Sequence, residues 1–138
     1  MPAERVKVPI QIRFADIDLA HHAHNAIYLH WFELARMALI SRFVPMDHDW
    51  ARHGLIVARN EIDHRAPVHL ADRIFVEVWC SAIGNKSFDL RYEVIREGDR
   101  RTICAEGRSV MVCFDLKAGK SLVLPDEWRN ALEQFLEP

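Results

Sequence analysis

Asp18 and Asn25 are the residues whose types and spacing point most directly to chemistry. They stand seven positions apart, in a segment that joins an alternating, strand-like stretch to a strongly apolar helical one. Unpaired N–H groups at the start of a helix favour negative charge, and a carboxylate beside them can act as a base or a nucleophile. Together they can attack a carbonyl carbon and stabilise the oxyanion that forms. The pair indicates a reaction class but no particular substrate.

Length and composition narrow the setting of this chemistry. The chain has 138 residues, 50% of them hydrophobic, which fits one domain over residues 1–138 with a sizeable core. A net charge of −2 provides no global basic field that would recruit nucleic acid or an anionic membrane. No apolar stretch approaches the roughly 20 residues of a membrane span, and the charged start lacks the apolar run of a signal peptide. We therefore expect a cytoplasmic protein.

The cysteines fit the same setting. They are odd in number, show no Cys-x-x-Cys spacing and lie within strand-like alternations: Cys80, Cys104 and Cys113. These features favour reduced thiols in the core over disulfides.

The elements that must position Asp18 and Asn25 follow from hydrophobic periodicity. Apolar residues alternate from Val6 to Phe14, which predicts a half-buried strand, and Pro9 favours an edge position because proline cannot donate to a ladder. From Ala26 to about Phe43 the period becomes helical, and the polar stripe is narrow. A helix that is apolar around most of its circumference is normally buried. A broad element, such as a curved sheet, is therefore expected to wrap it.

Segments further along the chain can supply this sheet. Alternating apolar residues predict strands at about 55–63, 74–80, 88–94 and 103–113, and a short amphipathic helix after Pro125. Turn residues at 83–86 and 97–100 indicate antiparallel hairpins. The predicted fold class is α+β, with one long helix against an antiparallel sheet of about five strands.

The same segments carry a resemblance to a known family. Residues 13–18, followed by residues 22–29, resemble the signature of hot-dog-fold acyl-CoA thioesterases of the 4-hydroxybenzoyl-CoA thioesterase type. The resemblance continues through residues 28–36, 62–67, 83–88 and 124–128, so it covers nearly the whole chain. It implies a hot-dog fold, in which the sheet wraps around one central helix. It also implies hydrolysis of an acyl-CoA substrate without metal or cofactor, in homodimers or homotetramers whose sites lie between subunits.

The resemblance assigns roles to individual positions. Asp18 matches the catalytic carboxylate, which is a nucleophile or a general base, and the backbone N–H of Asn25 matches the donor to the thioester carbonyl oxygen. Such a donor can contribute on the order of 3 kcal/mol to the transition state. The substrate-binding candidates are His24 at the pocket rim, Tyr28 in the acyl pocket, Arg65 and Lys86 for the coenzyme A phosphates, and Ser87. His21, where many relatives have glycine, and His24, where many have asparagine, leave the acyl preference open.

Structural interpretations of the same residues stay open. Asp16 is expected to support the loop, and Asp18 can also be interpreted as a residue that only caps a turn, because aspartate readily bonds neighbouring backbone. Asn25 suits a helix N-cap, which is compatible with a chemical role for its backbone. Histidines 21, 22, 24 and 30 could join these carboxylates as zinc ligands, although their spacing matches neither His-Glu-x-x-His nor a cysteine-rich pattern.

Glu33 is the rival carboxylate. Another hot-dog subgroup places its glutamate on the helix, eight residues after a donor glycine, and Asn25 stands eight residues before Glu33 here. The glycine pair that usually precedes the donor is absent. A hot-dog hydratase is disfavoured because its Gly-Asp-x-Asn-Pro context is missing. A non-catalytic acyl-CoA binding protein remains an alternative, against which the presence of Asp18 argues.

Overall fold

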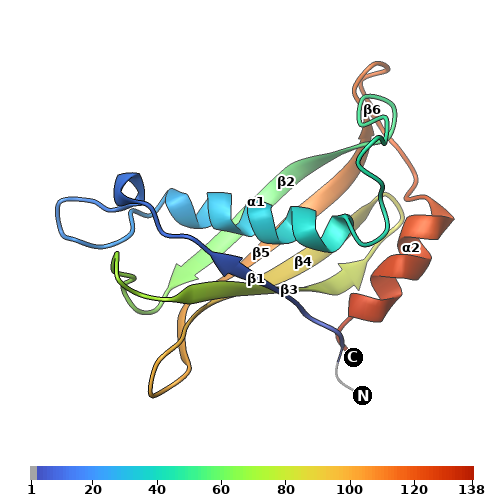
Figure 1. Cartoon of the computed structure of the whole chain (residues 1–138). Coiled ribbons are helices and arrows are strands. Elements are labelled where there is room, and N and C mark those ends of the chain that lie inside the picture. The colour runs from blue at the N-terminus through green and yellow to red at the C-terminus, as the bar shows by residue number, and fades with distance from the viewer. Residues whose placement is uncertain (1–2) are drawn as a thin grey trace.

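A strongly curved antiparallel sheet forms the body of the molecule (Figure 1). The structure is a computed structural model that describes residues 3–138. The sheet has the order β1-β3-β4-β5-β2, and a short β6 pairs with β5. Its strands are β1 (Val6–Ile10), β2 (Gly54–His64), β3 (Ile74–Ile83), β4 (Ser87–Arg96), β5 (Thr102–Asp115) and β6 (Lys120–Ser121). The predicted antiparallel hairpins and the edge position of the Pro9 strand are confirmed.

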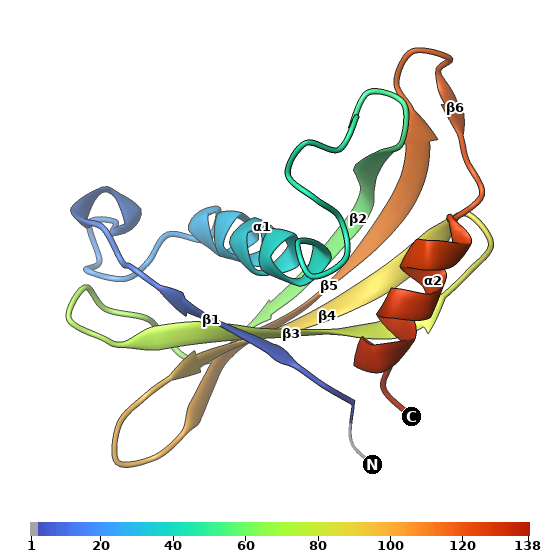
Figure 2. The same cartoon turned by 45° about the vertical axis from the view of Figure 1, so that its right-hand side comes forward.

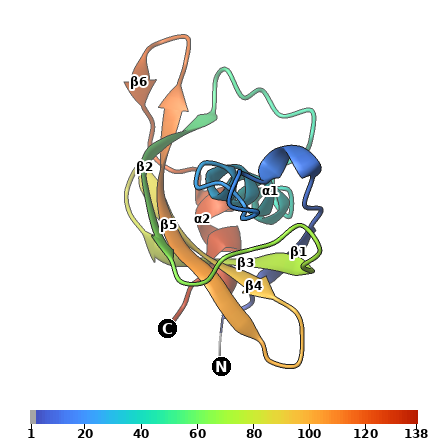
Figure 3. The ribbon, with the colours of Figure 1, turned by 90° about the vertical axis from the view of Figure 1, so that its left-hand side faces the viewer.

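The long helix α1 (Ile27–Ile40) lies in the concave side of the sheet, as the end-on view in Figure 3 shows. Five of its side chains are fully buried in the core: Trp31, Phe32, Ala35, Leu39 and Ile40. The helix packs against β1 and β3 rather than against β2. Leu34 and Met37 on its other side remain nearly half exposed. The predicted wrapping is therefore confirmed on the core side, whereas part of the apolar helix surface stays uncovered in one chain.

Element boundaries differ from the prediction at two places. The first strand ends at Ile10 rather than at Phe14, because a 3-10 turn, η1 (Phe14–Asp16), follows it and exposes the Phe14 side chain. Helix α1 ends at Ile40 rather than near Phe43. Pro45 follows shortly afterwards and disfavours helical backbone at the residue before it, so the chain turns away. The alternating and apolar patterns of the sequence do not by themselves predict where the first strand or the helix ends.

One glycine sets how closely helix and sheet approach. A Cβ added at Gly107 of β5 would overlap the Phe32 ring and lie 2.9 Å from the Glu61 carbonyl oxygen. The Phe32 ring is also stacked on Tyr92 of β4, with 4.3 Å between centroids and 9° between planes. The absence of a side chain at Gly107 thus lets an aromatic ring of α1 lie directly on the sheet.

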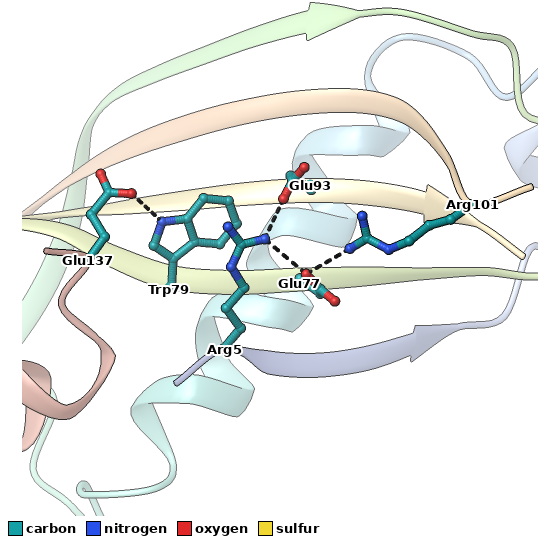
Figure 4. Close-up of polar contacts among 6 residues, drawn as sticks. All are labelled: Arg5, Glu77, Trp79, Glu93, Arg101 and Glu137. Carbon is teal, nitrogen blue, oxygen red and sulfur yellow. Dashed lines mark hydrogen bonds and ion pairs between the residues drawn. The ribbon is translucent and has the colours of Figure 1, made fainter. Parts of the chain in front are cut away.

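The outer face of the sheet is covered by charged side chains instead of by a second layer (Figure 4). The Arg5 guanidinium lies 3.7 Å from the Trp79 ring centroid and pairs with Glu77 and Glu93. The Trp79 indole N–H donates to Glu137 at 2.8 Å. These long side chains bury an aromatic ring while their charges stay in water.

The end of the molecule near the C-terminus of α1 is closed by the α1–β2 loop (residues 41–53) and by α2 (Asp126–Leu132), which continues into η2 (Glu133–Phe135) (Figure 2). Trp50 of the loop lies 6.2 Å from Trp128 of α2, and His48 lies between them, 4.6 Å and 5.4 Å from their rings. Within residues 3–138, no helix combines the length and apolar composition that crossing a bilayer requires.

Candidate active site

Asp18 lies in a tight loop that fixes the orientation of its carboxylate. Its Oδ1 accepts hydrogen bonds from the backbone N–H groups of Ala20 at 2.9 Å and His22 at 3.2 Å. The loop is closed by a backbone bond from the Asp18 N–H to the His22 carbonyl oxygen at 2.9 Å. His21 completes the turn with φ at 65°, a left-handed conformation that glycine adopts without strain. Because these bonds use only Oδ1, Oδ2 remains available to a substrate.

Asp16 supports this loop from beneath. Its side chain is 1% exposed and accepts bonds from the Arg13 side chain at 2.8 Å and from the Arg13 backbone N–H at 2.9 Å. Burial by itself would raise the pKa of Asp16, but the hydrogen bonds and charge of Arg13 outweigh it and lower that pKa below 3.8. The predicted supporting role of Asp16 is confirmed by these contacts.

A cavity of about 340 Å³ brings Asp18 together with the start of α1. It is lined by Asp18, His22, Ala23, Asn25, Tyr28, His64, Arg65, Ala66 and Pro67. Three segments distant in sequence thus meet here: the Asp18 loop, the first turn of α1, and the end of β2 with the residues after it. Four of the predicted site residues share this cavity: Asp18, Asn25, Tyr28 and Arg65.

Asn25 offers a free backbone donor to the cavity. Within the described chain, no hydrogen-bond acceptor is found for its N–H. The N-cap position of α1 is Ala26, and no side chain caps the helix. The expectation that Asn25 is the N-cap is therefore wrong, because the chain becomes helical one residue later. The Ile27 N–H, the first of α1, already donates to the His24 carbonyl oxygen at 3.1 Å, which leaves the Asn25 N–H as the donor available to an anion or carbonyl oxygen placed at the helix start.

Tyr28 lines the same cavity from the first turn of α1. Its ring meets His64 edge-on, with 4.7 Å between centroids, and the residue is 3% exposed. Burial raises the pKa of Tyr28 to about 12, so its hydroxyl is protonated at neutral pH.

The other predicted substrate-binding residues are more dispersed. Arg65 reaches the cavity rim but pairs with Glu106 at 3.2 Å. His24 is absent from the cavity wall, and its backbone N–H donates to the Asp16 carbonyl oxygen. Lys86 and Ser87 lie at the opposite end of the sheet, where Ser87 opposes Val112. Within one chain, the structure therefore does not bring Lys86 and Ser87 to Asp18.

The histidines near Asp18 do not converge on one point. His22 packs edge-on against His69 with 5.0 Å between centroids. In the described part of the chain, no group of three or more His, Cys, Asp or Glu side chains is arranged to hold a metal ion. The three cysteines are free and buried, as predicted.

Glu33 belongs to a second cavity, also of about 340 Å³, on the uncovered side of α1. The residues that line it are Glu33, Arg36, Met37 and Ile40 from α1, Trp50 from the α1–β2 loop, Gly54, Leu55 and Val57 from β2, Met111 from β5, and Leu116. The rival carboxylates are thus separated: Asp18 shares a cavity with the start of α1, whereas Glu33 lies almost two turns along α1 and borders the other cavity.

Sequence reasoning missed the roles of several wall residues. His64, Ala66 and Pro67 line the Asp18 cavity, although the sequence marks the segment 62–67 only as part of the resemblance. The available signal was the change from an alternating strand to a Pro-containing turn at His64. The position of Trp50 in a cavity wall could not be predicted, because a loop sequence does not show which cavity a side chain will border.

Comparisons with known proteins relate the chain to thioesterases in sequence and in fold. Residues 12–132 match the sequence profile of the family described as "Thioesterase-like superfamily". The chain is similar to the long-chain acyl-CoA thioesterase FadM of Escherichia coli (strain K12), with 27% identity over 133 residues that make up 96% of this chain and 100% of that protein. A predicted thioesterase from Bacillus stearothermophilus has a TM-score of 0.88 at 26% identity, covering 98% of this chain and 99% of that one. A thioesterase from Thermus thermophilus, solved with coenzyme A and zinc, has a TM-score of 0.81 at 30% identity, covering 94% of this chain and 92% of that one.

Proposed function

The chain belongs to the thioesterase-like superfamily, and on that basis we propose that it hydrolyses an acyl-CoA thioester at the cavity beside Asp18. The observation that carries this proposal is the shared cavity of a fixed carboxylate and an uncapped helix start. Its acyl-CoA substrate is supported by the similarity to FadM and by the coenzyme A complex of the Thermus thermophilus relative. We further propose that residues 1–138 act as one hot-dog domain.

The proposed mechanism uses only groups of this chain and water. The thioester carbonyl oxygen accepts a hydrogen bond from the Asn25 N–H, and the helix start stabilises the negative charge that develops on it. Asp18 either attacks the carbonyl carbon through Oδ2 or removes a proton from an attacking water. The C–S bond then breaks, coenzyme A leaves as its thiol after protonation, and the acyl group is released as the free acid. If Asp18 attacks directly, water hydrolyses the resulting anhydride.

We assign the reaction to the Asp-dependent, 4-hydroxybenzoyl-CoA thioesterase type. Asp18 has two backbone donors that orient it and lies in the cavity that holds the free Asn25 N–H. Glu33 lies about 9 Å along α1 from its first residue, Ile27, at 1.5 Å per residue, and it borders a different cavity. A carboxylate must be within hydrogen-bond reach of the reacting group, so this geometry favours Asp18.

We propose that the active species is at least a homodimer formed along β2. This strand is a long, unpaired sheet edge, and such edges readily pair with another chain. If two copies pair antiparallel about a two-fold axis near Arg59, the His64 end of one β2 meets the Gly54 end of the other. That arrangement moves Lys86 and Ser87 of a second copy toward the Asp18 cavity and gives them access to coenzyme A.

The decisive experiment compares the two carboxylates. Asp18→Asn keeps the volume of the side chain but removes its basicity and nucleophilicity, so kcat should fall by roughly 100-fold or more while acyl-CoA still binds. Glu33→Gln is the matched control and should retain most of the turnover. The assignment fails if Asp18→Asn stays active and Glu33→Gln is inactive. A wild-type protein that binds acyl-CoA without turnover would instead support the binding protein.

A further inference from the structure

The second cavity has the character of a hydrocarbon site. Most of its wall is apolar: Met37, Ile40, Trp50, Leu55, Val57, Met111 and Leu116. Arg36 also borders it, but its Nη1 donates to the Tyr92 hydroxyl at 3.2 Å, so the charged group is held toward the sheet. Small-molecule sites typically occupy about 300–1,000 Å³, and this cavity of about 340 Å³ lies near the lower limit.

This cavity is separate from the Asp18 site but is bordered by the same two elements, α1 and β2. Leu29, Glu33 and Met37 are spaced by four residues, so they follow one side of α1, and Asn25 stands just before the helix begins. Asn25 borders the first cavity, Glu33 and Met37 border the second, and Leu29 between them is partly exposed. On β2, His64 borders the first cavity and Val57 the second. An acyl chain that extends from the thioester carbon along this side of α1 therefore reaches the apolar cavity.

Trp50 closes the end of the cavity that is remote from Asp18. It comes from the loop that follows the C-terminus of α1, and the cavity wall beside it is Gly54, the first residue of β2. The loop is firmly placed: a Cβ at Gly54 would lie 2.5 Å from the Trp50 carbonyl oxygen, and the Leu116 N–H donates to the Ala51 carbonyl oxygen at 3.0 Å. Contact with Trp128 further limits movement of the ring.

We propose that this cavity holds the hydrocarbon tail of the acyl-CoA substrate and that Trp50 sets the longest chain that fits. The inference rests on the proposed thioesterase function and adds to it the substrate class, unbranched aliphatic acyl-CoA, and a residue that determines chain length. One methylene that enters or loses an apolar pocket changes kcat/KM by roughly 10-fold or more. Removing the Trp50 ring therefore extends the preference to longer chains, and adding volume beside it shortens the preference.

The test measures kcat/KM for saturated acyl-CoAs from hexanoyl to palmitoyl in the full chain and two opposed variants. Trp50→Ala should raise the ratio of palmitoyl-CoA to octanoyl-CoA turnover by roughly 10-fold, and Leu116→Phe should lower that ratio by a similar factor. Leu116 borders the cavity, is exposed and lies outside the β2 edge proposed for the dimer, so Leu116→Phe tests the inference even if Trp50→Ala does not fold. Val123→Phe is the matched control, because exposed Val123 lies outside the cavity wall and should leave the ratio unchanged.

The outcomes separate the two proposals. If wild-type protein is active but both cavity variants keep the wild-type chain-length ratio, the tail site is wrong and the thioesterase function stands. If wild-type protein has no turnover, the thioesterase function fails. The Kd values of the same acyl-CoA series, measured by calorimetry in the same variants, then decide the tail site: a shift toward longer chains in Trp50→Ala supports it, and an unchanged profile overturns it.

Discussion

At the residue scale, two aspartates two positions apart have different environments. Asp16 is buried and bound by Arg13, whereas Asp18 is exposed and is held through one oxygen by backbone N–H groups. The first arrangement fixes the loop, and the second leaves an oxygen available for reaction. Their sequence contexts hardly differ, so the division of roles depends on where the 3-10 turn directs each side chain.

The lowered pKa of Asp16 predicts an acid-dependent loss of stability. Because the folded-state pKa lies below the ordinary value of 3.8, the ionised group stabilises the fold above that pH, and this contribution is lost as the pH falls through the folded pKa. Asp16→Asn should lower the free energy of unfolding by about 2 kcal/mol near neutral pH. Between about pH 5 and 3, the free energy of unfolding of the variant should fall less than that of the wild type, because the variant has no carboxylate to protonate at this position.

Urea unfolding at a series of pH values measures this difference. Asp47→Asn makes the same chemical change at an exposed aspartate and serves as the control. Equal pH dependence in wild type and Asp16→Asn would show that the Arg13 contact contributes no acid-sensitive stability.

Much of the site could be predicted at this scale. The Asp18 to Asn25 spacing, Tyr28 and Arg65 all come from segments with recognisable patterns, and the structure brings them to one cavity. Their catalytic and binding roles remain predictions. The N-cap at Ala26 and the contribution of Trp50 could not be predicted, because each depends on a turn of the backbone that periodicity does not encode.

At the scale of elements, the position of α1 depends on how closely it approaches the sheet. The hairpins followed from turn residues and alternation, but the strand order was not predicted, and the packing of a helix on a sheet depends on side-chain volumes at facing positions. Phe32 can lie on β5 only because Gly107 lacks a side chain. We expect the same contact to set the distance between the sheet and the start of α1, and hence the position of the Asn25 N–H.

Gly107→Ala should therefore destabilise the fold. The added methyl group overlaps a ring that is itself stacked on Tyr92, so the cost should be about 1–3 kcal/mol, the usual range for overpacking. Thermal unfolding of Gly107→Ala, Phe32→Leu and the double variant measures it. The alanine should cost less in the Phe32→Leu background, because a smaller side chain then faces it.

Gly98→Ala is the matched control, since a Cβ there meets nothing closer than 3.9 Å. Additive effects of Gly107→Ala and Phe32→Leu would contradict the proposed contact.

At the scale of the whole molecule, the site of a single chain is incomplete if Lys86 and Ser87 bind coenzyme A. Both lie at the far end of β4, about seven residues from the position level with His64, or roughly 23 Å at 3.3 Å per residue. Pairing of two copies along β2 removes this separation by a two-fold rotation. In the proposed dimer we expect the second copy to cover exposed apolar side chains on that side of the molecule, among them Met37, which is 45% exposed in the single chain.

Mixing inactive subunits tests this arrangement. If Asp18 of one chain and Lys86 of its partner serve one site, dimers of Asp18→Asn with Lys86→Ala contain one intact site. An equal mixture should then recover roughly a quarter of wild-type activity, since about half of randomly mixed dimers are hybrids. Light scattering should show at least a dimer. A fully active monomer, or a mixture no more active than its separate components, would contradict shared sites.

The contacts around Trp79 on the outer face also affect how the fold forms and opens. Through this one ring, Arg5 and Glu137 are held together although 131 residues separate them in sequence. Contacts between segments so far apart in sequence form once the sheet between them exists, so we expect these contacts to form in the last steps of folding. Interactions absent from the transition state act mainly on the rate of unfolding. We therefore expect the Arg5–Trp79–Glu137 cluster to slow unfolding of the finished sheet while leaving the rate of folding nearly unchanged.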